Sequence, residues 1–177
     1  MMKPAPNNYP AYYHSYISLV QQHQISEALE QSGHQVAADF LAIDPQKHDY
    51  RYAPDKWSVK QLLGHIIDTE RILAYRALRF ARQDPQQPLS FDENAYALHN
   101  DGTHRNLPDM VHEFKAQRAS TVCLFNSFTG PQLQLSGQTA AGAISVLALG
   151  FVICGHALHH HNVLQQKYLS NSPSPLK

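Results

Sequence analysis

Residues 144–169 read ISVLALGFVICGHALHHHNVLQQKYL. On a helix of 3.6 residues per turn, the first half of this segment is apolar on nearly every side, and the second half is rich in histidine. A helix that is apolar all round is normally buried in the interior of its domain. The segment therefore predicts a long central helix, which ends before the Ser-Asn-Ser-Pro sequence at residues 170–173.

Three further long helices are expected. Ile25 to Leu41 carries an apolar stripe at helical spacing, and a helix from Ser58 to Arg82 begins with a capping-box pattern between Ser58 and Gln61. Another helix begins near Pro108 and stops at Gly130-Pro131. Shorter features complete the chain: a short helix over 12–20, a helical turn over 92–98 within a loop, and a partly extended connection over 132–142.

Four long helices without a convincing strand pattern predict an all-α protein, a four-helix bundle. The length of 177 residues fits one domain over 1–177, with a loose arm over about 1–10 and a tail over about 170–177.

The 14 basic and 14 acidic residues leave no net charge, which argues against a nucleic-acid or polybasic membrane-surface protein. Neither a signal peptide nor an apolar run of membrane-spanning length is present, so we expect a cytoplasmic protein. Cys123 and Cys154 lie in apolar sequence and are expected to be buried and unpaired.

Histidine is the unusual component, with 12 residues against only 16% charged residues. His156 and His160 are four residues apart and therefore share one helix face, along an otherwise apolar stripe. His65 stands in the apolar run Leu-Leu-Gly-His-Ile-Ile. Buried imidazoles need partners, and a divalent metal can supply one to all three. The alternatives are an ordinary surface pair for His156 and His160, and a core histidine bonded to a backbone carbonyl for His65.

Other polar residues are weaker site candidates. Arg76 shares the face of His65 and could hold an anionic substrate, or it could form an ordinary surface ion pair. Asp68 and Glu70 could orient the histidines or act as a base, or they could lie on a solvated helix face. The loop around Glu93 could cover the mouth of a site or merely cap a short helix, and its residues share these alternatives: Asp92, Asn94, Tyr96 and His99. Trp57 is expected to anchor the packing at the start of its helix.

Several of these stretches resemble the DinB/YfiT-like family, which is named for DNA-damage-inducible proteins and is unrelated to the polymerase that shares the name. The resemblance rests on KWSVKQLLGHIIDTER at 56–71, AYRALRFAR at 74–82, FDENAY at 91–96 and GHALHH at 155–160. It extends over roughly residues 9–169, nearly the whole chain. The combination is specific, although a pair of histidines four residues apart is not.

The resemblance implies a bundle with up-down-down-up connectivity, often assembled as a homodimer. It also implies a metal site with one histidine from the second helix and two from the fourth. His65, His156 and His160 occupy those positions. Relatives bind zinc or nickel, and some branches are thiol-dependent transferases or isomerases that use a low-molecular-weight thiol.

Two classes of function follow. In the first, three protein ligands leave a coordination position open, and the protein is a metal-dependent S-transferase or hydrolase acting on a small molecule. In the second, the metal only stabilises a non-catalytic stress or binding protein. A metal-free bundle, in which the histidines make only hydrogen bonds, is the third option.

Overall fold

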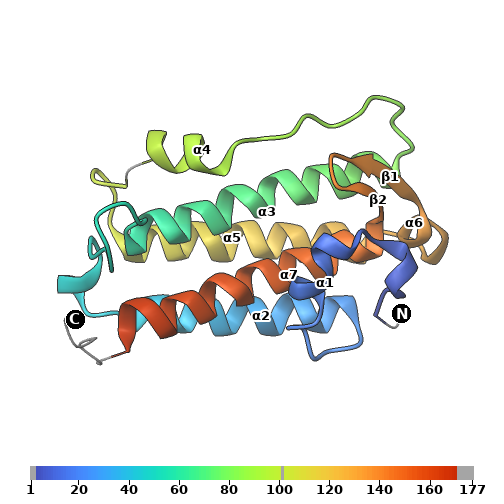
Figure 1. The fold of residues 1–177 in the computed structure, drawn as a ribbon. Coiled ribbons are helices and arrows are strands. Elements are labelled where there is room, and N and C mark those ends of the chain that lie inside the picture. The colour runs from blue at the N-terminus through green and yellow to red at the C-terminus, as the bar shows by residue number, and fades with distance from the viewer. Residues whose placement is uncertain (1–2, 101, 171–177) are drawn as a thin grey trace.

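The computed structural model describes residues 3–100 and 102–170. Its body is a bundle of four long helices, α2 (Ile25–Leu41), α3 (Val59–Ala81), α5 (Leu107–Asn126) and α7 (Val146–Val163) (Figure 1). Helices α2 and α3 each pack against both α5 and α7, so α2 and α3 occupy opposite corners of the bundle. The expected four-helix bundle is confirmed.

The start of α3 shows how local sequence positions the site. The Ser58 hydroxyl accepts the Gln61 amide at 3.2 Å, and the Gln61 side chain accepts the Ser58 amide at 3.0 Å. This reciprocal capping satisfies two amides that have no partner within the helix. The helix starts one residue after Ser58 and ends one residue before Arg82, in close agreement with the sequence prediction.

Helix α7 is the central helix that its composition predicts, because every residue from Val146 to Ala157 is buried. Two details differ from expectation. The chain enters α7 through a strand, so Ile144 and Ser145 are not helical. Beyond Val163 the helix widens into a π-helical segment, Leu164–Leu169.

The connection before α7 contains more structure than the sequence indicated. Gly130 and Pro131 do not simply end α5; they begin α6 (Gly130–Gln134), capped by Thr129 and Gln132. A two-stranded antiparallel hairpin follows, β1 (Ser136–Thr139) and β2 (Gly142–Ser145). The connection was expected to be partly extended, and the all-α expectation is corrected by this one small hairpin. Gly142 has a φ of +124°, a conformation that is strained for other residues.

The N-terminal segment also departs from expectation. It forms short helical turns at Pro6–Asn8 and Ala11–Tyr13 and a single turn of α-helix, α1 (His14–Ile17), instead of a helix over 12–20. From residue 3 onward the expected loose arm packs on the bundle, where Tyr9 is buried and α1 lies against α7. Residues 171–177 of the expected tail lie outside the described residues.

The connection from α3 to α5 runs back along the bundle and carries α4 (Glu93–His99) (Figure 1). Asp92 caps α4 by accepting the backbone amides of Asn94 and Ala95. Helix α4 packs on α3, so this crossover covers the helix that bears His65.

The apolar core is divided along the bundle axis. One cluster gathers around Leu29, Leu73 and Phe151, and the other around Phe40, Leu63 and Phe114. Polar side chains occupy the level between the two clusters: Ser32, Glu70, Arg118, Thr121 and His156. Cys154 is buried as expected, but Cys123 is exposed, which corrects the expectation for that residue.

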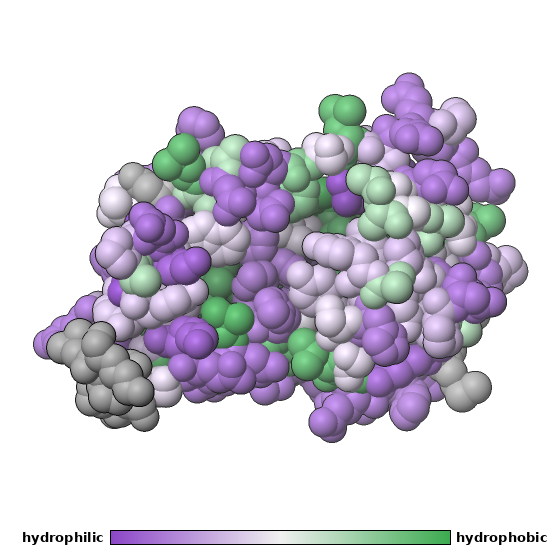
Figure 2. Space-filling model, in the orientation of Figure 1, coloured by the Kyte–Doolittle hydropathy of each residue, from purple (hydrophilic) through white to green (hydrophobic). Residues whose placement is uncertain are grey.

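The visible face of the molecule is mostly hydrophilic, with scattered apolar residues (Figure 2). Across the described part of the chain, no helix combines the length and the apolar character that crossing a membrane requires.

Candidate metal centre

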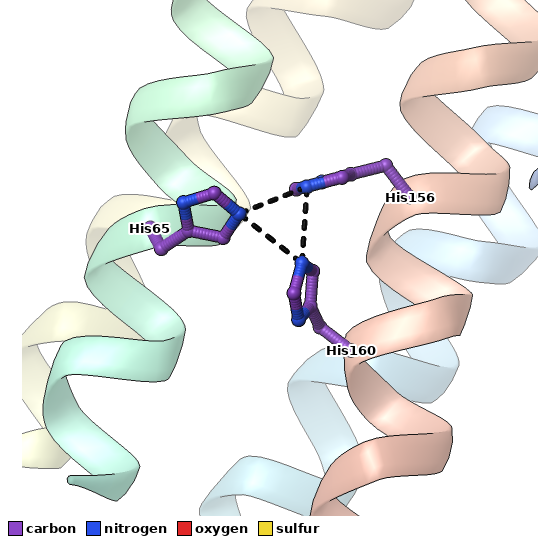
Figure 3. A group of neighbouring side chains, drawn as sticks. All are labelled: His65, His156 and His160. Carbon is purple, nitrogen blue, oxygen red and sulfur yellow. Dashed lines mark hydrogen bonds between the residues drawn. The ribbon is translucent and has the colours of Figure 1, made fainter. Parts of the chain in front are cut away.

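Three histidine side chains converge between α3 and α7 (Figure 3). The Nε2 atom of His65 lies 3.0 Å from that of His156 and 3.1 Å from that of His160. The Nε2 atoms of His156 and His160 are 3.1 Å apart, because one helical turn separates the two residues. His156 is buried, and the other two are partly exposed.

This triangle cannot be satisfied by hydrogen bonds among neutral imidazoles. Each Nε2 atom either carries a hydrogen and donates or carries a lone pair and accepts. With two roles and three atoms, at least one edge joins two donors or two acceptors. A cation bound to all three lone pairs removes this conflict. The observed spacing is close to the edge of about 3.3 Å that tetrahedral Zn–N bonds of 2.0–2.1 Å imply, so the three residues fit a metal.

The electrostatic environment keeps these rings neutral. Burial, followed by the charge of His159, lowers the pKa of His65 to about 4. Burial and the neighbouring His65 and His159 lower the pKa of His160 to about 2. Burial and the other histidines hold the pKa of His156 well below its usual value. Neutral imidazole is the form that binds metals.

These lowered pKa values predict that the metal-free protein is sensitive to acid. Histidines in the unfolded chain have a pKa of about 6.5. Below that pH the unfolded chain therefore binds protons that the folded site does not bind. The site's stabilising contribution is complete above about pH 6.5 and is lost as pH falls towards 4. We expect each histidine to cost up to about 1.4 kcal/mol per pH unit in that window. Urea unfolding of metal-free protein at pH 7.5, 6.0 and 5.0 measures the slope. An equally steep slope in a His156→Ala/His160→Ala variant would contradict the assignment.

A pocket of about 220 Å³ lies beside the histidines. Trp57 forms one wall, with its ring centroid 4.6 Å from that of His65. Tyr16 forms another, with its ring edge-on to His156 at 5.7 Å between centroids. Phe91 and Glu93 of the crossover also line this pocket. The cluster therefore faces a space in which a small molecule can reach it.

Residues 28–164 match the family model of the DinB superfamily. The chain belongs to the DinB superfamily. Its fold is similar to that of YfiT from Bacillus subtilis, with a TM-score of 0.70 and 14% identity over 93% of this chain and 92% of that chain. YfiT is described as a probable metal-dependent hydrolase with an unusual four-helix bundle topology. No curated protein matches the sequence.

In this DinB-superfamily chain, two of the weaker candidates line the pocket. Arg76 is buried and donates from Nη2 to the Leu89 carbonyl at 2.8 Å, not to an acidic side chain as its alternative reading required. Glu93 belongs to the pocket wall, at the start of α4. The crossover thus does more than cap a short helix, although Asp92 makes the cap.

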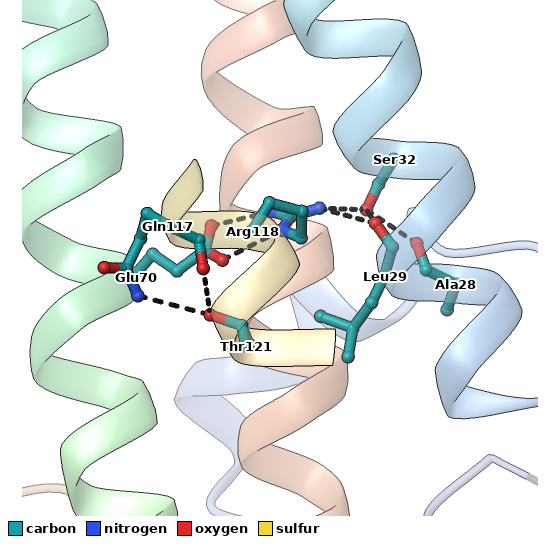
Figure 4. Close-up of polar contacts among 7 residues, drawn as sticks. All are labelled: Ala28, Leu29, Ser32, Glu70, Gln117, Arg118 and Thr121. Carbon is teal, nitrogen blue, oxygen red and sulfur yellow. Dashed lines mark hydrogen bonds and ion pairs between the residues drawn. The ribbon is translucent and has the colours of Figure 1, made fainter. Parts of the chain in front are cut away.

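Two other candidates lie elsewhere. Asp68 contacts Arg71 at 3.4 Å and lies outside the pocket lining. Burial raises the pKa of Asp68, and Arg71 opposes that rise. Glu70 is neither a partner of the histidines nor solvated. It is 2% exposed and forms two hydrogen bonds with Arg118 of α5, at 2.9 and 2.8 Å (Figure 4).

Some of the remaining polar and aromatic residues lie beside the histidines, and others lie away from them. His159, next to the cluster on α7, is exposed, whereas His161 is buried and pairs with Asp39 of α2. Trp57 anchors packing as expected, because its carbonyl accepts the Tyr168 hydroxyl, and it also covers His65. Outside the pocket lining, Asn94 and His99 are exposed and Tyr96 packs on Phe91.

Sequence reasoning missed the tyrosines of the N-terminal segment. Tyr12, Tyr13 and Tyr16 line the pocket, and burial followed by the effect of Tyr12 raises the pKa of Tyr16 to about 12. The Tyr16 hydroxyl therefore keeps its proton and can donate a hydrogen bond. The available signal was composition, since four of the eight residues from Tyr9 to Tyr16 are tyrosine.

The contact that holds these tyrosines in place depends on Gly155. A Cβ atom at this position would lie 2.0 Å from the Tyr16 carbonyl oxygen. We expect Gly155→Ala to displace α1 and to destabilise the fold by about 1–3 kcal/mol, the usual cost of overpacking. Faster chymotryptic cleavage after Tyr12 or Tyr16 would report the displacement. Lys167→Ala, at an exposed site, is the control, and cleavage as slow as in the wild type would disprove the contact.

Proposed function

We propose that this protein is a metal-dependent enzyme whose single divalent ion is held by His65, His156 and His160. The observation that supports the proposal is the triangle of Nε2 atoms, 3.0–3.1 Å apart, at the wall of a pocket. Zinc is the first choice for three imidazoles in a tetrahedral arrangement, and nickel is the alternative.

The site is of the open kind. Among the described residues the cluster consists of these three histidines, without a fourth histidine, cysteine or carboxylate. Three protein ligands with a free position are typical of catalytic sites, whereas structural zinc sites have four protein ligands. A divalent ion here would bring a water or thiol ligand close to deprotonation at neutral pH.

The protein's own groups supply the rest of the chemistry. Glu93 can accept the proton released by the nucleophile, because this acidic residue lines the same pocket. Tyr16 can donate a hydrogen bond to the oxygen on which charge develops, since its high pKa keeps it protonated. Trp57 covers His65 and limits the access of bulk water on that side.

Hydrolysis is the first reaction we propose, supported by the fold shared with YfiT and that protein's description. Thiol-dependent S-transfer, with a low-molecular-weight thiol as co-substrate, is the alternative.

The proposal includes the up-down-down-up connectivity and the homodimer that are usual in relatives. The return of the α3–α5 connection along the bundle supports that connectivity, because it lets α3 and α5 run in the same direction (Figure 1).

The test compares metal-free protein with protein reloaded with zinc or nickel. Substrates are a panel of p-nitrophenyl esters and amino-acid p-nitroanilides, together with conjugation of glutathione or cysteine to a chlorinated arene. We expect turnover in one panel only after metal loading. We expect at least about 100-fold less turnover in His65→Gln, which loses a ligand, and about 100-fold less in Glu93→Gln, which loses the proposed base.

His112→Ala, at an exposed histidine on α5, is the matched control and should retain full turnover. Loss of stability on chelation, without turnover in either panel, would instead support the non-catalytic, metal-stabilised protein.

A further inference from the structure

The α3 wall of the pocket carries two polar side chains without adequate partners. Thr69 and Arg76 follow His65 by 4 and 11 residues, so all three share one face of the helix. Thr69 is 6% exposed and Arg76 is 9% exposed, and both line the pocket. The Thr69 Oγ1 and Arg76 Nε atoms are buried without a hydrogen-bond partner in the described chain.

Arg76 differs from the other buried arginines of the described residues. Arg118 pairs with Glu70, and Arg79 pairs with Asp84. Arg76 has no carboxylate partner among residues 3–100 and 102–170, and its one protein acceptor is the Leu89 carbonyl. Burial lowers the pKa of Arg76, and no neighbouring carboxylate opposes that effect among the described residues. A buried cation with free N–H groups needs an anion.

We propose that Arg76 and Thr69 bind the carboxylate end of a small substrate whose other end reaches the three histidines. The planar guanidinium fork matches the two oxygens of a carboxylate, and the hydroxyl adds a third donor. This inference rests on the proposed function for the identity of the reacting end. The carboxylate site itself needs only the two side chains on α3.

The geometry also sets the size of the substrate. Eleven residues of helix place the backbone of Arg76 about 16 Å from that of His65, and helical side chains lean towards the N-terminus. The arginine therefore reaches back, and the two ends of the substrate lie on the order of 10 Å apart. The pocket volume of about 220 Å³ accommodates a molecule of dipeptide size.

The first experiment measures the affinity of zinc-loaded protein for linear dicarboxylates from succinate to sebacate, each beside the monocarboxylate of equal length. One carboxylate occupies the histidine end and the other reaches Arg76. We expect an optimum at intermediate length with at least tenfold tighter binding than the monocarboxylate. This higher affinity for the dicarboxylate should disappear in Arg76→Gln and fall several-fold in Thr69→Val. The control is Arg79→Gln, because Arg79 lies one turn away and pairs with Asp84; this variant should keep the higher affinity. A dicarboxylate advantage that survives Arg76→Gln overturns the proposal.

A second measurement separates this inference from the metal. In metal-free protein labelled with ¹⁵N, the Arg76 Nε–H resonance should shift on addition of hexanoate. A shift in a chain that binds no zinc supports the carboxylate site and rejects the metal centre. If the protein binds zinc but the Arg76 resonance does not shift on addition of hexanoate, the result supports the metal centre and rejects the carboxylate site. Inorganic phosphate that shifts the resonance at tenfold lower concentration than hexanoate would overturn the choice of a carboxylate.

Discussion

The double substitution His156→Ala/His160→Ala is expected to reduce bound metal from about one ion per chain to less than a tenth of that value. Two of the three converging nitrogens disappear, and a single remaining imidazole binds a divalent ion only weakly. Elemental analysis of protein purified without a histidine tag or a nickel column measures the change. The folded state should survive, because the substitution also removes two imidazoles from a triangle that hydrogen bonds alone cannot satisfy.

His159→Ala is the matched control, since this exposed residue lies between the two proposed ligands in the sequence and is not one of the three histidines whose ligand atoms converge. It should keep its full metal content. Full metal content in the double variant would show that the ion binds elsewhere. A wild-type protein without metal, whose melting temperature is unchanged by a chelator, would leave a bundle in which the histidines serve packing only.

The second large effect is expected at Glu70. Its carboxylate and the Arg118 guanidinium are buried together, and Arg118 also donates to the Leu29 carbonyl and the Ser32 hydroxyl, each at 2.8 Å (Figure 4). Burial alone would lower the pKa of Arg118, but the Glu70 charge outweighs burial and raises it. Glu70→Gln leaves that cation without a counter-charge. We expect a loss of about 3–5 kcal/mol in the free energy of unfolding, and a melting temperature lower by on the order of 10 °C.

Two further variants make this prediction specific. Glu70→Gln/Arg118→Met should regain much of the lost stability, because the second substitution removes the positive charge of Arg118 that Glu70→Gln leaves buried without a partner. Asp68→Asn, two residues earlier on the same helix, should cost less than about 1 kcal/mol, since its contact with Arg71 is longer and more exposed. Chemical denaturation of the four proteins provides the comparison. A Glu70→Gln protein as stable as the wild type would show that the pair contributes little.

Sequence alone was most informative where the physics is local. The apolar stripe of α2, the continuous apolar run at the start of α7 and the capping box at Ser58 depend on residues within a few positions of each other. The shared face of His156 and His160 follows from helix geometry, and their burial follows from the apolar first half of α7. The convergence of His65 on them was an expectation that the family resemblance strengthened, and the structure places the three side chains together.

Local patterns failed where partners come from distant segments. Glu70 could not be distinguished from a solvated residue, because its partner Arg118 lies 48 positions away on another helix. The sequence around the tyrosines near the N-terminus has no helical or strand pattern from which their packing against α7 could be predicted. The hairpin over 136–145 was missed because its short strands carry small and polar residues with little alternation.

The sequence by itself determined the helices, their caps, the apolar core and the pair of histidines on one face, since each arises from spacing along a single segment. Only the tertiary structure decided which charged residues pair inside the bundle and which are left facing the pocket. Arg118 finds Glu70 and Arg76 finds no carboxylate among the described residues, although both are buried arginines on long helices. The reason is physical: the free energy of a buried charge depends on the groups around it in space, which the packing of all four helices brings together.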